Sequence, residues 1–427
     1  MRRSVHCHFY LPSVLRNTPA FGTLKRHFSL PVRAAAFLNR KFIMRVDFYR
    51  HDLGPKNAEA VAKVLSTPFL TSGAVCKAVE SDLIAYFGCT HALMVNSWTN
   101  GAAATLMAMD IGPGHEVIVP AMTFIATSNV VELVGAKPIF VDVEPGTLLM
   151  TADAVKAALT PQTRAIIPVH LYGQMVDIAA IRAMLSSCGR SDVKIIEDCA
   201  HCFEGQIDGK RPGADSTAAI FSFYATKNVT CGEGGTIITN DDDLFAKIQQ
   251  TRLHGMSAGA ADRFKTGHYR HWDMARMGMK ANLPDLLACL LPPQIATIDQ
   301  RLPVREKLAQ RYEAAFAKTP IKFQHLLPNR RHARHLFVIH VPPSIRDDVL
   351  THMGTKEIGC TVNYRLVPTL TYYAKKYGYT PNQFPVSSAW GNGTLSLPFF
   401  PSMTKDEQDY VIDTLLKDVI PMIEKAA

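Results

Sequence analysis

Short apolar runs alternate with longer amphipathic stretches over about residues 75–255. The apolar runs, which predict strands, cover residues 92–95, 116–119, 138–142, 165–170, 193–198, 218–224 and 235–239. The amphipathic stretches, which predict helices, include residues 102–109, 126–134, 152–158 and 178–185. Strands that alternate with helices are typical of a mostly parallel sheet that is covered by helices on both faces. The pattern therefore predicts an α/β fold for this part of the chain.

The pattern changes after residue 255. Residues 256–282 are irregular and rich in His, Arg, Met and Gly, which predicts a long loop that serves function or lies at an interface. A long helical pattern then covers residues 283–317. Beyond it strands and helices alternate less regularly, and a closing helix is expected around residues 404–423. We therefore expect a large domain over residues 44–300 and a smaller C-terminal α+β domain over residues 301–427.

The positive charge of the chain is concentrated at its start. The formal net charge is +9, and residues 1–45 contain nine Lys and Arg but no Asp or Glu, so they account for the whole excess. In the rest of the chain the positive and negative charges are equal in number, and we expect no nucleic-acid partner. The basic, acid-free residues 1–43 resemble a transit peptide. We nevertheless expect a disordered extension or a start codon that was assigned too early, and organelle targeting is the alternative.

Membrane insertion, disulfides and metal binding are not expected either. No apolar run reaches the ~20 residues that a membrane span needs. The nine cysteines are odd in number and scattered, which favours a reducing compartment and a cytoplasmic protein. Cys199 and Cys202, with His201 between them, form a CxxC pattern that fits a redox pair or half of a zinc site. No second CxxC or His pair completes a tetrahedral set, so we expect no metal.

A carboxylate and a lysine follow two of the predicted strands. Asp198 ends the run 193–198, and Lys227 comes shortly after the run 218–224. Carboxyl ends of parallel strands lie at one edge of a sheet, where α/β proteins assemble sites. Pyridoxal phosphate needs an anion at its pyridinium nitrogen and an amine for its aldehyde carbon, and burial makes a lysine a better nucleophile by lowering its pKa. The alternative is that Asp198 caps a helix and that Lys227 lies on the surface.

A candidate phosphate site precedes the predicted helix over residues 102–109. Residues 96–101 are small and polar apart from one tryptophan, and backbone N–H groups and hydroxyls at a helix start suit a phosphate. Thr99 lies in this segment, and Ser222 is expected to add a hydroxyl. Ordinary helix capping is the alternative for the segment. Phe124 is a candidate for stacking on a flat ring, with a place in the core as the alternative.

Further motifs follow one another along the chain in a fixed order. They are FLTSG (69–73), TFIAT (123–127), FVDV (140–143), VHLYG (169–173), EDCAH (197–201), FSFYATKN (221–228), GEGG (232–235) and LSLPFFP (395–401). With these motifs the chain resembles the DegT/DnrJ/EryC1/StrS family of sugar aminotransferases from about Asp47 to its C-terminus. FSFYATKN, which contains Lys227, is the most specific of them.

The resemblance implies a fold and an activity. The implied fold is the fold-type I PLP transferase architecture, with pyridoxal 5'-phosphate as cofactor. Family members move an amino group, usually from glutamate, to a keto-sugar that is linked to a nucleoside diphosphate. From the frequency of substrates in the family we expect a 4-keto-6-deoxyhexose, in the biosynthesis of deoxyamino sugars and surface polysaccharides.

The resemblance also implies roles for individual residues. Lys227 is the catalytic lysine that binds the cofactor, and Asp198 is the partner of the pyridinium nitrogen. His201 stands where the family has Gln or His near the cofactor's phenolic oxygen. The positions that match phosphate-binding residues are Trp98, Thr99 and Ser222. Asn282 resembles an asparagine that reaches the phosphate in the neighbouring subunit's site, which implies a homodimer with shared active sites.

The sequence departs from the family's pattern at two positions, and three other classes of protein remain as alternatives to an active aminotransferase. Trp98 stands where a small residue is common, so we expect backbone N–H groups to bind the phosphate there. Asn363 precedes Tyr364 where many relatives have His-Tyr near the substrate, which leaves the sugar's identity open. A dehydratase-type relative would carry histidine at position 227, and a non-catalytic relative would lack Lys227 or Asp198. A nicotinamide-dependent oxidoreductase would need G-x-G-x-x-G after the first strand.

Overall fold

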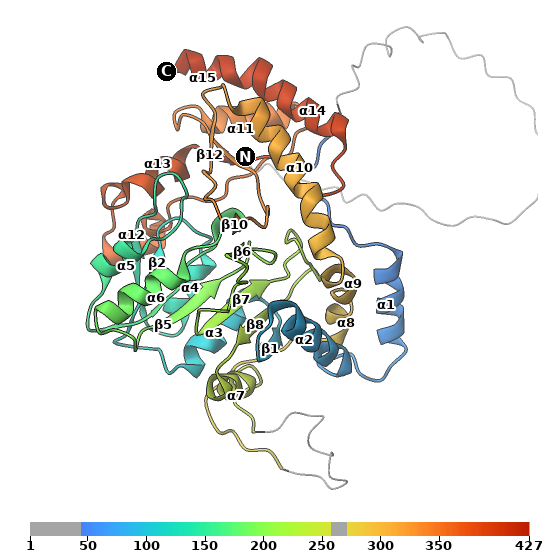
Figure 1. Cartoon of the computed structure of the whole chain (residues 1–427), viewed down its shortest axis with the longest axis vertical. Coiled ribbons are helices and arrows are strands. Elements are labelled where there is room, and N and C mark those ends of the chain that lie inside the picture. The colour runs from blue at the N-terminus through green and yellow to red at the C-terminus, as the bar shows by residue number, and fades with distance from the viewer. Residues whose placement is uncertain (1–43, 258–270, 427) are drawn as a thin grey trace, which may run out of the picture. The chain divides into compact units, whose positions relative to one another are not determined.

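The computed structural model describes residues 44–257 and 271–426 (Figure 1). Its main feature is a seven-stranded sheet with the strand order β1-β8-β7-β5-β4-β2-β3. The strands are β1 (His91–Val95), β2 (Glu116–Pro120), β3 (Lys137–Val141), β4 (Thr163–Ile166), β5 (Lys194–Asp198), β7 (Ala218–Ser222) and β8 (Gly235–Thr239). Each of the seven predicted strands is present. The predictions for residues 1–43 and for 258–270 of the long loop fall outside the described residues.

The sheet is parallel except at β8. The pairs β5–β7, β4–β5, β2–β4 and β2–β3 are parallel, whereas β8 runs antiparallel to both β7 and β1. Residues 223–234 connect β7 directly to its neighbour β8 without a helix, which only antiparallel neighbours allow. β1 and β7 both run against β8, so their carboxyl ends lie at the same edge of the sheet as that of β5.

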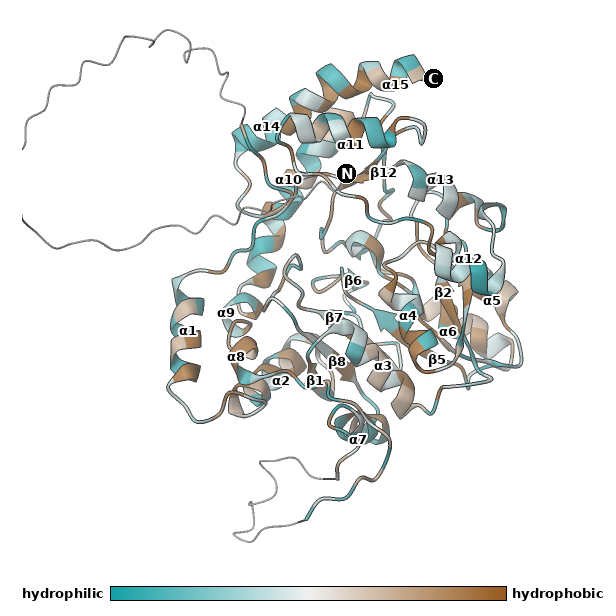
Figure 2. Ribbon diagram, turned by 180° about the vertical axis from the view of Figure 1, so that it is seen from behind, coloured by the Kyte–Doolittle hydropathy of each residue, from teal (hydrophilic) through white to brown (hydrophobic). Residues whose placement is uncertain are grey.

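Helices cover both faces of this sheet. They are α2 (Ala74–Phe87), α3 (Trp98–Ala108), α4 (Ala126–Leu133), α5 (Ala152–Ala158), α6 (Ile178–Ser187) and α7 (Asp242–Thr251). Side chains of one strand alternate between two cores, as the pleat requires. Leu93 of β1 packs in a core with Leu106 of α3, and its neighbour Met94 packs in another core with Leu83 of α2. Figure 2 shows hydrophobic residues on β2 and β5 and hydrophilic ones on outer helices such as α14. The predicted α/β architecture is confirmed.

The predicted helix over residues 283–317 is divided into three. These are α8 (Asp285–Ala288), α9 (Pro292–Ile295) and α10 (Ile298–Phe316). The first break, between α8 and α9, falls just before Pro292 and Pro293, which take the first turn of α9, where the missing N–H group of a proline costs no helical hydrogen bond. The closing helix contains a π-helical turn at Leu415–Val419, between α14 (Lys405–Thr414) and α15 (Ile420–Ala426).

A second, antiparallel sheet lies in the C-terminal part of the chain. Its order is β12-β11-β9, and the strands are β9 (Lys322–Phe323), β11 (Val338–His340) and β12 (Thr394–Ser396). It shares a core with α10, α14 and α11 (Arg346–Thr355) (Figure 1). The division of the chain into domains at residue 300 stays a prediction.

The remaining elements are short or peripheral. The strands are β6 (Gln206–Ile207) and β10 (Arg330–Arg331), and the α-helices are α1 (Pro55–Leu65), α12 (Thr371–Tyr377) and α13 (Pro385–Gly393). Short 3-10 turns lie at Leu171–Gly173, Val367–Thr369 and Pro381–Gln383. None of the helices in the described parts of the chain is long and apolar enough to cross a membrane.

Candidate active site

A cavity of about 480 Å³ lies at the carboxyl ends of β1, β5 and β7. Its walls include seven of the eight residues that the sequence predicts for the site: Trp98, Thr99, Phe124, Asp198, His201, Ser222 and Lys227. They come from segments separated by more than 120 positions, and the shared sheet edge brings them together. Asn282 is not among the residues that line this cavity.

Asp198 is the last residue of β5, and its carboxylate is held from two sides. Its Oδ1 accepts a hydrogen bond from the N–H of Ala200 at 3.1 Å, and its Oδ2 accepts one from the hydroxyl of Thr127 at 2.9 Å. Burial raises the pKa of Asp198, while these two bonds and the nearby Lys227 oppose the rise. The next element along the chain is β6, so Asp198 does not cap a helix.

Thr127 is oriented by a second hydroxyl. Its Oγ1 lies 2.9 Å from Oγ1 of Thr123, within the TFIAT motif. Because a carboxylate accepts and does not donate, the hydroxyl proton of Thr127 is directed to Asp198, and Thr123 donates to Thr127. The two threonines therefore form a short chain of donors that ends on the carboxylate.

Lys227 lies in the connection between β7 and β8. Its backbone N–H bonds to the carbonyl of Tyr224 at 2.9 Å, which closes a turn just beyond β7. The side chain faces the cavity, and it is the only amine among the lining residues. Burial lowers the pKa of Lys227 from 10.5 to about 8, and Asp198 opposes this shift. At neutral pH a larger fraction of this amine is therefore uncharged and nucleophilic than in a solvent-exposed lysine.

The phosphate candidates gather around the start of α3. Ser97 is the N-cap of this helix, and its Oγ accepts from the N–H of Asn100 at 3.1 Å. The indole N–H of Trp98 donates to the carbonyl of Ile220 at 3.1 Å, so its side chain is fixed in the core. The hydroxyl of Thr99 and the backbone N–H groups of Trp98 and Thr99 remain as donors, since a helix start leaves them without intrahelical partners. Ser222 lies opposite, at the end of β7.

His201 and Tyr364 form one wall of the cavity, and the side chain of Tyr364 contributes a phenol group to this wall. Nδ1 of His201 accepts from the N–H of Tyr172 at 3.2 Å, and its Nε2 lies 3.0 Å from the hydroxyl oxygen of Tyr364. Burial lowers the pKa of His201 well below its ordinary value, so the ring is neutral. Its single proton is then on Nε2 and is donated to Tyr364. The hydroxyl proton of Tyr364 remains available to a bound molecule.

Phe124 and Asn282 differ in their placement. The side chain of Phe124 is 52% exposed and lines the cavity, with its ring centroid 5.8 Å from that of Tyr364. It is not a core residue. Nδ2 of Asn282 donates to Oγ of Ser72 at 2.6 Å, while its buried Oδ1 has no hydrogen-bond partner among the described residues. The preceding residue, Ala281, accepts from the N–H of Asn96, which keeps Asn282 beside the start of the phosphate segment.

A buried polar network adjoins Lys227 and was not foreseen from the sequence. Asn228 donates its Nδ2 to Oε2 of Glu204 at 2.9 Å and to the carbonyl of Ala333 at 2.8 Å. Glu204 also accepts from Nη1 of Arg305 at 3.0 Å, and Oδ1 of Asn228 lies 3.1 Å from Nδ1 of His335. The only signal in the sequence is that Asn228 follows the lysine, because the network's other members are 24 or more positions away.

Removing the charge of Glu204 is expected to destabilise the fold. Its carboxylate is fully buried, and its partner Arg305 is 5% exposed. The substitution Glu204→Gln leaves the arginine charge buried without the carboxylate that is hydrogen-bonded to it, which typically costs about 3–5 kcal/mol. We expect the apoprotein variant to unfold at a clearly lower urea concentration. A matched control is Asp413→Asn, which breaks the exposed pair with Lys417 and should cost less than about 1 kcal/mol. Equal shifts for both variants would contradict this prediction.

His170, Glu197 and Cys199 form a cluster of potential metal ligands that are already engaged. Nε2 of His170 lies 2.7 Å from Oε2 of Glu197, and its Nδ1 accepts from the N–H of Val176 at 3.0 Å. The second oxygen of Glu197 accepts from the N–H of Gly213 at 2.7 Å. These contacts join the segments around β5.

The sheet and the cavity at its edge define a fold-type I transferase that uses pyridoxal phosphate. The profile of the DegT/DnrJ/EryC1/StrS aminotransferase family matches residues 51–416, and the chain belongs to this family. A protein of Streptococcus pneumoniae described as a sugar aminotransferase, solved in a PMP form, shares 27% identity over 88% of this chain and 98% of its own, with a TM-score of 0.81. DesV of S. venezuelae shares 29% identity over 87% and 97%, with a TM-score of 0.80. A family member from Brucella abortus shares 30% identity over 84% and 94%, with a TM-score of 0.76.

These comparisons establish the class of reaction and the cofactor. The chain is a transaminase of a family of sugar aminotransferases, and the Streptococcus relative has been solved in both PLP and PMP forms. The residues of the cavity fit this cofactor. They provide a buried carboxylate, an amine whose pKa is lowered, and a helix start with free N–H donors.

Substitution of Thr127 tests whether its hydrogen bond to Asp198 contributes to the binding of the cofactor. The substitution Thr127→Val keeps the volume of the side chain but removes the hydrogen bond to Asp198. Since bonds to charged groups contribute about 1.5–3 kcal/mol, we expect the affinity for pyridoxal phosphate to fall at least about tenfold. Absorbance titration of the apoprotein measures this. Thr123→Val, which touches Thr127 but not Asp198, is the matched control and should have a smaller effect. An unchanged affinity in Thr127→Val would contradict the role of this bond.

Proposed function

We propose that the protein transfers the amino group of glutamate to a nucleotide-linked keto-sugar, with a 4-keto-6-deoxyhexose as the sugar. The product would serve the biosynthesis of deoxyamino sugars and surface polysaccharides. The observation that carries the proposal is that Lys227 and Asp198 face one cavity in a member of a sugar aminotransferase family. The presence of both residues favours an active enzyme over a regulatory member of the family.

Each residue of the cavity has a role in this proposal. When bound, the cofactor supplies an electron sink for the carbanion formed at the substrate carbon. Asp198 would hold the proton on its ring nitrogen, and Lys227 would bind its aldehyde carbon and carry a proton to and from the substrate carbon. Phe124 would pack on the ring, and His201 with Tyr364 would lie at its phenolic side. The phosphate is bound by the start of α3, with Trp98 contributing its backbone, and by Thr99 and Ser222.

We further propose a homodimer in which Asn282 reaches the phosphate of the partner subunit's site. Two observations support it. Oδ1 of Asn282 is buried without a partner, and the aromatic rings of Phe124 and Tyr224 are about half exposed at the cavity. A second subunit would cover such rings. The enzyme is placed in the cytoplasm in this proposal, on the basis of nine scattered cysteines with no disulfide pattern.

Half-reactions test the substrates separately. The purified enzyme loaded with cofactor is mixed with glutamate, and its visible absorption band is expected to disappear as the cofactor takes up the amino group. A panel of nucleotide-linked keto-sugars is then added, varied in nucleotide and in the position of the keto group. The true acceptor restores the band. If glutamate bleaches the band and only an amino-acid-derived keto acid restores it, the sugar assignment is wrong.

Mixed dimers test the shared site. The variants Lys227→Ala and Asn282→Ala are each expected to have little activity. In a hybrid of the two, one site carries both changes and the other carries neither. Coexpression in equal amounts should therefore restore about a quarter of the wild-type activity, because half of the dimers are hybrids. If no activity returns although hybrids form, Asn282 acts within its own subunit.

A further inference from the structure

The hydrogen bonds of Asn228 fix the state of the His335 ring. Nδ2 of Asn228 donates to the carbonyl of Ala333 and to Glu204, so its Oδ1 is the atom that faces His335. An amide oxygen only accepts hydrogen bonds, and Nδ1 of His335 must therefore carry a proton. Burial and the positive charge of Lys227 lower the pKa of His335 well below its ordinary value. The ring is neutral, and its Nε2 is an unprotonated acceptor.

His335 and Lys227 share a second, smaller cavity. This cavity of about 30 Å³ is also lined by Thr226 and Asn228, and it is large enough to hold one or two water molecules. Lys227 and Thr226 line the 480 Å³ cavity as well. The lysine therefore stands between the two cavities, with Asp198 in the wall of the large one and His335 in the wall of the small one.

The small cavity offers a hydrogen-bond acceptor to the amine of Lys227 when this amine is free. A charged amine in a buried site is costly unless it has hydrogen-bond acceptors. Asp198 serves the ring nitrogen in the proposed function, so it cannot fully serve the amine. Nε2 of His335 is the unprotonated nitrogen on the opposite side.

We propose that His335 is a positioning residue for Lys227: its Nε2 accepts a hydrogen bond from the lysine amine, directly or through one water, when that amine is free and charged. Glu204 and Arg305 act through Asn228, since they hold the amide that keeps the proton on Nδ1. The proposal rests on the proposed role of Lys227. The proposal adds a second position for the amine of Lys227, away from the substrate. The amine would take this position while it is not covalently attached to the cofactor.

The test has to take account of every charged group around the two side chains. His335 is faced by Lys227, by Arg305 from α10, by His332 and by His201, whose ring centroid is 4.4 Å away. The acidic groups are Asp198 on the far side of Lys227 and Glu204 behind Asn228. The other titratable groups that line the small cavity are Tyr49, Arg50, His51, Asp52 and Arg301. Only Asp198 opposes the lowering of the Lys227 pKa by burial.

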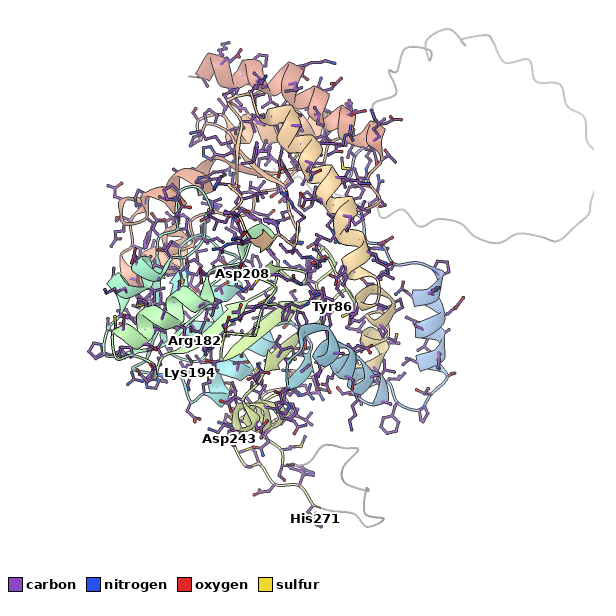
Figure 3. All side chains as sticks on the ribbon, viewed as in Figure 1. Tyr86, Arg182, Lys194, Asp208, Asp243 and His271 are labelled. Carbon is purple, nitrogen blue, oxygen red and sulfur yellow. The ribbon has the colours of Figure 1, made fainter. Side chains whose placement is uncertain are left out.

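The pKa of Lys227 in the apoprotein is the readout, and it needs no catalysis. The apoprotein is treated with a limiting amount of acetic anhydride at a series of pH values, and peptide mass spectrometry measures the acetylation of each lysine. Lys194, an exposed lysine at the start of β5 that Figure 3 labels, is the internal standard. For the wild-type protein we expect a midpoint near pH 8 at Lys227.

Two substitutions at the same position separate the hydrogen bond from simple packing. In His335→Asn, the side-chain amide can still donate to Asn228, but the acceptor toward Lys227 is lost. In His335→Gln, the longer side chain places an acceptor close to the position of Nε2. We expect the midpoint at Lys227 to fall by about one unit in His335→Asn, because the charged amine loses a hydrogen bond, and to recover at least partly in His335→Gln.

The control is His332→Asn. His332 is a second histidine whose pKa burial lowers, three positions away, and it does not line either cavity at Lys227. Its substitution should leave the midpoint unchanged. The proposal is wrong if His335→Asn stays within about 0.3 unit of the wild type, or if His335→Gln falls as far as His335→Asn. Neither result depends on turnover. Failure of the proposal on His335 therefore leaves the proposed function standing, and the proposal can be confirmed even with an inactive enzyme.

A measurement on the wild-type protein covers the case that the variants do not fold. Nitrogen-15 NMR of histidine-labelled apoprotein distinguishes the two neutral tautomers of a ring. We expect the His335 signals to show a protonated Nδ1 and a bare Nε2 at pH 7. Protonation of Nε2 instead would leave no acceptor for the lysine and would overturn the proposal.

Discussion

Lys227→Ala is expected to lose transamination completely and to bind the cofactor without its visible absorption band, while the protein remains folded. Among the described residues, Lys227 is the only amine that lines the 480 Å³ cavity, so none of these neighbours could replace it in the proposed binding of the aldehyde and transfer of the proton. Loss of general acid–base catalysis alone typically costs 10²–10⁴-fold. Loss of the covalent attachment adds to this, and we expect kcat to fall by at least about 10⁴-fold. Lys194→Ala, at the amino end of β5, is the control and should have wild-type activity.

The same substitution has an expected effect on stability that depends on pH. The pKa of Lys227 is about 8 in the fold and 10.5 when the chain is unfolded. Between these values the unfolded chain binds a proton that the folded chain does not, so the stability of the wild-type apoprotein rises with pH from about 8 to 10.5. Below pH 8 the folded protein bears the full cost of the buried charge. Lys227→Ala lacks this contribution, and its unfolding midpoint should therefore change less over that range.

Retention of the absorption band in Lys227→Ala would contradict the assignment of the lysine. Loss of the band with unchanged activity would separate covalent attachment from catalysis. A variant that is unfolded by circular dichroism would not test the role, and Lys227→Arg, which keeps the charge but cannot attach the aldehyde, then takes its place.

The strands could be predicted from the sequence because buried parallel strands are apolar throughout. Six of the seven strands begin and end within two residues of the predicted bounds. The exception is β4, which was expected over residues 165–170 but ends at Ile166, and Pro168 beyond it cannot donate to a neighbouring strand. Strand direction was harder to predict, because the apolar run of β8 is like that of a parallel strand. The absence of an amphipathic stretch over residues 223–234 was the available signal.

The candidate site was predictable where its residues follow strands. Asp198 and Lys227 belong to this class, because the edge of the sheet alone brings their segments together. The hydrogen bonds formed around them were not predictable. Thr127 lies 71 positions from Asp198, and His335 lies 107 positions from Asn228. No local pattern reveals such contacts, since they arise from the packing of separate elements.

Asp198→Asn is expected to reduce kcat by about 10²–10³-fold, the size of effect seen when a preorganised electrostatic partner is removed. The amide has nearly the shape of the carboxylate but carries no charge, so it cannot hold the proton on the ring nitrogen. The hydrogen-bond pattern also changes. Asp198 accepts from Ala200 and from Thr127 through its two oxygens, whereas an amide has only one oxygen and must turn its NH₂ group toward one of these donors or toward the cofactor.

The pKa of Lys227 provides a second readout for this variant. The charge of Asp198 opposes the lowering of that pKa by burial, so in Asp198→Asn the midpoint of Lys227 acetylation should fall below pH 8 in the apoprotein. Asp198→Glu keeps the charge and displaces it by one methylene group. In Asp198→Glu the pKa of Lys227 should stay close to the wild-type value, whereas kcat should fall. The electrostatic attraction tolerates a displaced charge, but the proposed bond to the ring nitrogen does not. If Asp198→Asn keeps both its activity and its Lys227 midpoint, the carboxylate serves only the packing of β5, and the anion that the ring nitrogen requires has to come from another residue.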